Sequence, residues 1–111
     1  MGASKSDFFS DAQNETADIF KALGHPARIA IIQHILKSPS CICSDLVEVL
    51  PLSQATVSQH LRELKSANIL KGSIEGNSIC YCLNEDTIKK IKSTLELFLD
   101  NSLQLKNKQC C

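Results

Sequence analysis

The 111-residue sequence lacks net charge, a secretion signal and any apolar run long enough to cross a membrane. Its 12 Lys and Arg residues balance 12 Asp and Glu residues, which argues against a strongly basic nucleic-acid-binding protein without locating any charged patch. The N-terminal stretch MGASKSDFFS contains no apolar signal-peptide core. We therefore expect a cytoplasmic protein whose six cysteines do not form the disulfide framework of a secreted scaffold.

The sequence also lacks the residue patterns of an enzyme. Its serines have no partnered histidine and acid, no glycine-rich phosphate loop follows a strand, and its carboxylates are scattered. Apolar residues make up 43% of the chain and charged residues 22%, which is typical of a globular domain. We expect one domain that binds a partner and is not an enzyme.

Apolar spacing predicts a mainly α-helical domain with one β-hairpin. Gly24 is expected to end the first helix, and Pro26 is expected at the first position of the second. The predicted organisation is a flexible N-terminus over 1–11, a winged helix-turn-helix domain over 12–105 and a tail with a cysteine pair over 106–111. Within the domain we expect helices over 12–23, 27–37, 53–64 and 85–105, a short helix ending at Pro51, and strands over 69–74 and 79–83.

The segment 53–64 is the candidate for a helix that contacts DNA. Ser53 suits its N-cap, and Val57, Leu61 and Leu64 form one apolar stripe. An ordinary solvated helix face is the alternative, but the tight turn before the segment and the hairpin after it favour a recognition helix followed by a wing. The remaining side chains can hydrogen-bond to bases and phosphates: Ser53, Gln54, Thr56, Ser58, Gln59, His60 and Arg62.

The last predicted helix has a wider apolar stripe than a small domain needs for its own core. Together with the first helix it is a plausible dimer interface. The stripe consists of Ile88, Ile91, Leu95, Phe98, Leu99 and Leu103.

Three stretches of the sequence, LGHPARIAII, CICSDLVEVLPLSQATVSQHLREL and ICYCLN, resemble the ArsR/SmtB family of bacterial winged-helix repressors. The resemblance covers roughly residues 20–83. It implies a homodimer that binds an imperfect palindrome in double-stranded DNA and controls an operon for metal, metalloid or thiol stress. It also places the polar residues of 53–64 where the family contacts DNA. The predicted wing tip, residues 75–78, lacks the arginine that family wings often carry.

The motif Cys41-Ile42-Cys43 resembles the thiol site of arsenic-sensing family members, and soft trivalent arsenic or antimony prefers thiolate ligands. Residues i and i+2 do not face each other on a helix, so one ion held by both thiols requires a non-helical turn. Ligand binding would thus distort the support of the recognition helix. Leu46 stands where a third family cysteine is often found, so Cys110 and Cys111 are the candidates for the third ligand. The alternative is that this terminal pair is incidental.

The other cysteines and the histidines are expected to be structural. Cys80 and Cys82 share one strand face, where we expect them to pack under the wing; they lie about 7 Å apart, too far for a mutual disulfide. Residues 85–105 contain no histidine, which disfavours the zinc site that other family members carry there. His25 is expected to cap or pack beside Pro26, His34 to be a surface or core residue, and His60 to face DNA or pack.

The leading hypothesis is a dimeric repressor that trivalent arsenic or antimony releases from its operator, with no obligatory cofactor and no membrane partner. One alternative keeps the fold but makes the signal thiol oxidation or reactive sulfur. Another is a helical interaction module without an operator, which would bind DNA only in a salt-sensitive, sequence-independent way.

Overall fold

The computed structural model describes residues 5–38, 41–42, 50–74 and 80–105, with side chains between residues 7 and 100. The expected short helix before Pro51, the wing tip and the C-terminal tail lie outside these residues. The elements are η1 (Lys5–Phe8), α1 (Asp11–Leu23), α2 (Pro26–Lys37), α3 (Gln54–Ser66), β1 (Leu70–Ser73), β2 (Cys80–Leu83) and α4 (Glu85–Leu105). This confirms the predicted mainly helical class with a small hairpin. No helix in the described part of the chain is both long and apolar enough to span a membrane.

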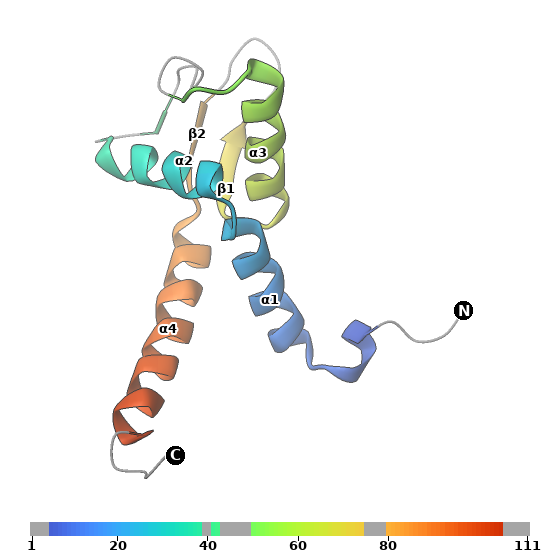
Figure 1. Cartoon of the computed structure of the whole chain (residues 1–111), viewed down its shortest axis with the longest axis vertical. Coiled ribbons are helices and arrows are strands. Elements are labelled where there is room, and N and C mark those ends of the chain that lie inside the picture. The colour runs from blue at the N-terminus through green and yellow to red at the C-terminus, as the bar shows by residue number, and fades with distance from the viewer. Residues whose placement is uncertain (1–4, 39–40, 43–49, 75–79, 106–111) are drawn as a thin grey trace.

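Figure 1 shows two parts of the arrangement. The first is a body in which α2 and α3 lie beside the β1–β2 hairpin. The second is a pair of helices, α1 and α4, that extend from this body and diverge. The DNA-contacting candidate therefore lies in the compact body, whereas α4 and the N-terminal part of α1 extend away from it.

Local capping sets the helix starts. Ser10 caps α1 in a capping box with Gln13, in which the Gln13 N–H donates to Ser10 Oγ at 3.1 Å, so α1 begins one residue earlier than predicted. Pro26 is the first residue of α2, and His25 Nδ1 accepts from the Ala27 N–H at 3.0 Å. The predicted capping role of His25 is therefore confirmed. Gly24 ends α1 as expected, with φ of −78° and not in the left-handed conformation of a typical C′ glycine.

The hairpin has an additional neighbour that the sequence did not predict. β1 pairs antiparallel with β2, with Gly72 opposite Tyr81, and both strands are shorter than predicted. On the other edge of β2, Ile42 forms an antiparallel bridge with Tyr81. The Ile42 N–H donates to the Tyr81 carbonyl at 2.8 Å, and the Tyr81 N–H donates back at 2.9 Å. The segment at residues 41–42 is thus tied to the wing.

The core lies between α1, α2, α3 and the hairpin. Tyr81 is one of its most deeply buried residues, whereas Cys80 is exposed and Cys82 half-buried. The expectation that both cysteines pack under the wing is therefore wrong, because the strand alternation turns Tyr81 to the core and its two neighbours away. The buried apolar residues are Ile19, Ala22, Ile31, Ile35, Ile42, Val57, Leu61, Leu64, Ile69, Leu70 and Tyr81.

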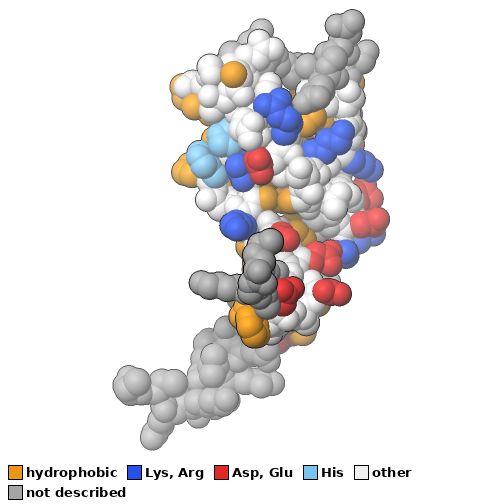
Figure 2. All heavy atoms as spheres, turned by 90° about the vertical axis from the view of Figure 1, so that its right-hand side faces the viewer, with side chains coloured by type: hydrophobic (Ala, Val, Ile, Leu, Met, Phe, Trp, Pro, Cys, Tyr) orange, Lys and Arg blue, Asp and Glu red, His pale blue; other side chains and the backbone are white. Residues whose placement is uncertain are grey.

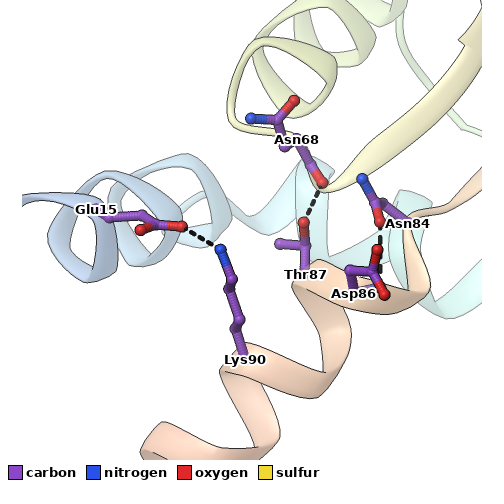
Figure 3. A network of polar contacts seen from close by, with 6 residues as sticks. All are labelled: Glu15, Asn68, Asn84, Asp86, Thr87 and Lys90. Carbon is purple, nitrogen blue, oxygen red and sulfur yellow. Dashed lines mark hydrogen bonds and ion pairs between the residues drawn. The ribbon is translucent and has the colours of Figure 1, made fainter. Parts of the chain in front are cut away.

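Polar contacts fix the start of α4 (Figure 3). The buried Thr87 hydroxyl donates to the carbonyl of Asn68, which has a φ of 61° just after α3. The Asn84 side chain accepts from the Asp86 N–H at 3.1 Å. Farther along, Lys90 Nζ lies 2.7 Å from Glu15 Oε1 of α1. The direction of α4 is therefore set by contacts with both the α3–β1 junction and α1.

Candidate DNA-contacting helix and thiol pair

The helix α3 is built as the sequence predicts. Ser53 is its N-cap, with an extended backbone, and its hydroxyl accepts from the Thr56 N–H at 3.3 Å. A second contact of 2.9 Å joins the hydroxyls of Ser53 and Thr56. Val57, Leu61 and Leu64 are buried, as predicted for the apolar stripe.

The opposite side of α3 is exposed and polar. Gln54, Thr56, Gln59 and Arg62 are exposed, whereas Ser58 is half-buried. Arg62 Nη2 donates to Gln59 Oε1 at 3.1 Å, and the Gln59 amide donates to Glu63 at 3.0 Å. These bonds are made on the surface, so a DNA duplex could replace them at small cost, since exposed polar groups exchange partners readily.

His60 differs from the other predicted contact residues because it is only 8% exposed. Its Nδ1 accepts from Arg28 Nε at 3.1 Å, and its ring centroid lies 4.5 Å from that of His25. Burial, followed by the nearby His25 and Arg28, lowers the pKa of His60. Of the two roles that the sequence left open, packing is therefore favoured over DNA contact.

Arg28 was not singled out from the sequence. Besides bonding His60, it donates through Nη1 to the Ala22 carbonyl at 3.1 Å. It therefore connects the end of α1 with α2 and α3. The burial of His60 could have been predicted from the sequence, since this residue lies three positions after Val57 and four before Leu64, on the buried stripe. The contacts of Arg28 could not have been predicted in this way, because its partners are set by the packing of three helices.

A positively charged depression adjoins the exposed face of α3. It lies between α3 and β1 and is lined by Arg62, Lys65, Ser66, Ser73 and Ile74. In Figure 2, Lys and Arg side chains gather over the upper part of this view, while Asp and Glu lie mostly below. The chain is neutral overall, yet two of its cations, Arg62 and Lys65, line this depression beside the exposed face of α3.

The described cysteines lie on or beside β2. Cys41 and Cys82 are thiols, and a hydrogen bond joins their side chains. That hydrogen bond, together with burial, raises the pKa of Cys82, while Lys71 acts in the opposite direction. Cys80 is disulfide-bonded, with neither of these two as its partner.

The remaining predicted thiol ligands, Cys43, Cys110 and Cys111, lie outside the described residues. Within the described ranges, no three His, Cys, Asp or Glu side chains cluster closely enough to hold a metal ion. His34, predicted as surface or core, is half-buried on α2. The contact between Cys82 and Cys41 was not predicted from the sequence.

Large apolar side chains are exposed on α4 and just before α1, the two helices predicted to form the dimer surface. On α4 these side chains are between 45% and 63% exposed. Near α1 the two phenylalanines are also exposed, Phe8 by 77% and Phe9 by 57%. The α4 group consists of Leu95, Leu97, Phe98 and Leu99.

Comparison with known proteins matches residues 23–72 to a family model described as a helix-turn-helix domain. A Staphylococcus aureus homologue of the cadmium resistance transcriptional regulatory protein CadC is 33% identical over 92 residues, which span 82% of this chain and 75% of that protein. The arsenical resistance operon repressor of Staphylococcus xylosus is 30% identical over 83 residues, spanning 75% of this chain and 79% of that protein.

Among solved structures, an ArsR-like transcriptional regulator from Rhodococcus sp. RHA1 aligns with a TM-score of 0.68. The alignment covers 92% of this chain and all of that chain, at 22% sequence identity. At this identity the likeness concerns the fold.

Proposed function

The chain belongs to the ArsR/SmtB family of helix-turn-helix transcriptional regulators, and on that premise we propose that it is a homodimeric repressor whose operator complex is released by trivalent arsenic or antimony. A regulator of this family is not an enzyme. The proposed partner is double-stranded DNA with an imperfect palindrome, in the cytoplasm.

One observation carries the DNA-binding part of the proposal, namely the exposed polar face of α3. Gln54, Thr56, Gln59 and Arg62 can donate and accept hydrogen bonds at base edges, and Ser53 lies at the positive N-terminal end of the helix. Arg62 also lines the positive depression beside β1, where a phosphate would be attracted.

The apolar side chains of α4 support the homodimer. Leu95, Phe98 and Leu99 share one side of α4 and are each more than two-fifths exposed, and exposed apolar surface of this kind is typical of protein interfaces. A dimer with a two-fold axis would present two copies of α3, which matches a palindromic operator.

The thiol chemistry supports the inducer. Cys41 is an exposed thiol in the segment that leads toward α3, and Cys43 follows it at the spacing of the family's arsenic-sensing site. Trivalent arsenic prefers such sulfur ligands. The tail cysteines Cys110 and Cys111 remain proposed sources of a third ligand. The relative from Staphylococcus xylosus is an arsenical resistance repressor, which agrees with this inducer class.

The test of DNA binding is a fluorescence anisotropy titration on the DNA upstream of the chain's own operon. Gln59→Ala should weaken binding roughly 5- to 150-fold, because one good base contact contributes about 1–3 kcal/mol of discrimination. Gln33→Ala, which removes an exposed glutamine from α2, is the matched control and should leave the affinity unchanged. Equal affinities for the two variants would contradict the assignment of α3 as the recognition helix.

The test of induction adds arsenite to the preformed complex. Wild-type protein should release the DNA, and the Cys41→Ser, Cys43→Ser double variant should stay bound. Release of the double variant at the same arsenite concentration would refute the thiol site.

A second candidate is a repressor controlled by thiol oxidation, and the disulfide at Cys80 favours it. In that case a peroxide would take two electrons and two protons from a pair of thiols, and dithiothreitol would reverse the reaction. Peroxide-induced release of DNA that dithiothreitol restores, without any response to arsenite, would identify this alternative.

A further inference from the structure

The bridge between Ile42 and Tyr81 fixes which residues face each other beside it. These two residues exchange both backbone hydrogen bonds, at 2.8 and 2.9 Å, so they form a hydrogen-bonded antiparallel pair. The antiparallel register of this isolated bridge places Cys41 opposite Cys82, at a position of the non-hydrogen-bonded kind, in which side chains lie closest. The hydrogen bond between the two thiols agrees with this register.

The two thiols lie on the outer side of the bridge. Ile42 and Tyr81 are buried, whereas Cys41 is exposed and Cys82 is half-buried. Lys71 of β1 is opposite Cys82, so a cation continues the row of side chains across the strands. Both cysteines line one surface pocket, and reagents in solution can therefore reach the pair.

We propose that Cys41 and Cys82 form a two-thiolate site for trivalent arsenicals, with Cys82 supplying from the wing strand a ligand that the sequence assigned only to the tail. The inference rests on the proposed function for its role in induction. The site itself rests on the cross-strand geometry alone.

The two thiols face each other closely enough to share one bridging atom. Directly opposed residues in an antiparallel pair have Cβ atoms about 4.5–5.5 Å apart, and this distance is at its shortest in a non-hydrogen-bonded pair such as this one. An arsenic atom can therefore bind both sulfurs without pulling the strands together. With an aryl arsenoxide the reaction is balanced: two S–H bonds and the As=O bond are exchanged for two As–S bonds and one water.

Closing this site would join two parts of the DNA-binding unit. Cys82 belongs to β2 of the wing, and Cys41 belongs to the segment between α2 and α3. A clamp between them fixes the wing relative to the chain that leads into α3. Ligand binding would in this way act on the placement of the recognition helix and the wing together.

The test uses a full-length variant in which Cys43, Cys80, Cys110 and Cys111 are replaced by serine, leaving only the proposed pair. Phenylarsine oxide is added in the presence of a phosphine reductant, followed by iodoacetamide and intact mass spectrometry. We expect one phenylarsenic group per chain and no alkylation of either thiol.

Two matched controls carry one further change, Cys41→Ser or Cys82→Ser, in the same background. Each should bind the arsenical at least about 100-fold more weakly in competition with glutathione, because the second As–S bond is then no longer intramolecular. A Cys82→Ser control that binds as tightly as its parent overturns the proposal.

If circular dichroism shows that the four-serine variant does not fold, the reduced wild-type chain is treated with the arsenical, alkylated and mapped by peptide mass spectrometry. Protection of Cys82 supports the site, and alkylation of Cys82 with protection of the tail thiols overturns it. The DNA assay separates the two proposals. Chelation by Cys41 and Cys82 without release of DNA by arsenite refutes the proposed function, whereas release of DNA with Cys82 still reactive refutes only this site.

Discussion

Replacing Gly72 by alanine should destabilise the β1–β2 hairpin, which forms the wing. Gly72 has a φ of 111°, where residues with a side chain are strained by about 1–3 kcal/mol. A Cβ built at this position would lie 2.3 Å from the Cys80 carbonyl oxygen and 3.0 Å from Tyr81 Cα. Both are backbone atoms of the paired strand, so the strands themselves would have to separate. We expect the free energy of unfolding to fall by about 2–4 kcal/mol in total.

The measurement is urea denaturation followed by circular dichroism, at one fixed protein concentration because dimer formation would contribute to stability. Gly24→Ala is the matched control: Gly24 has a φ of −78°, and a Cβ there would meet the Phe20 carbonyl oxygen at 3.3 Å. That change should stay within about 1 kcal/mol of wild type, since reduced freedom of the unfolded chain offsets the tight contact. Equal stabilities for Gly72→Ala and Gly24→Ala would refute the steric reasoning.

Three further predictions concern other parts of the fold. Ser53→Ala removes the N-cap of α3 and should lower the free energy of unfolding, measured by urea denaturation, by about 1 kcal/mol. The control Ser93→Ala, at an exposed position of α4, should lower it by less than about 0.5 kcal/mol. Thr87→Val keeps the buried shape but deprives the Asn68 carbonyl of its donor, so it should lower stability by about 1–2 kcal/mol; unchanged stability would argue against that hydrogen bond. The pKa of His60 is lowered in the folded state, so the unfolded chain takes up a proton more readily as pH falls through 6.5. The free energy of unfolding should therefore decline from pH 7.5 to 5.5. The contribution of His60 to this decline should be absent in His60→Gln and present in the control His34→Gln.

Much of the helical framework could be predicted because its signals are local in the chain. Pro26 and Ser53 mark helix starts, and the spacing of Val57, Leu61 and Leu64 defines the buried side of α3. The same spacing contains His60, so its burial was available from periodicity but was outweighed by its polar character. The exposed position of Gln59 follows from the same pattern.

The expected surroundings of the cysteines were only partly right. The prediction that Cys80 and Cys82 share one strand face follows from strand alternation and is right. The further prediction that this face packs on the core is wrong. The structure gives the core side to Tyr81, because α2 and α3 pack against that side of the hairpin. A strand pattern alone shows that two faces exist but not which one is covered.

The sequence by itself determined the class of fold, the approximate limits of α1 to α4 and the polar face of α3, since each depends on residues within a few turns of one another. Tertiary structure decided that Cys41 lies against Cys82 and that Arg28 bonds His60. Each of these pairs joins residues more than thirty positions apart, and their contact depends on how strands and helices pack. Local spacing carries no information on such packing, so the thiol pair could be recognised only once the segment at Ile42 was found beside β2.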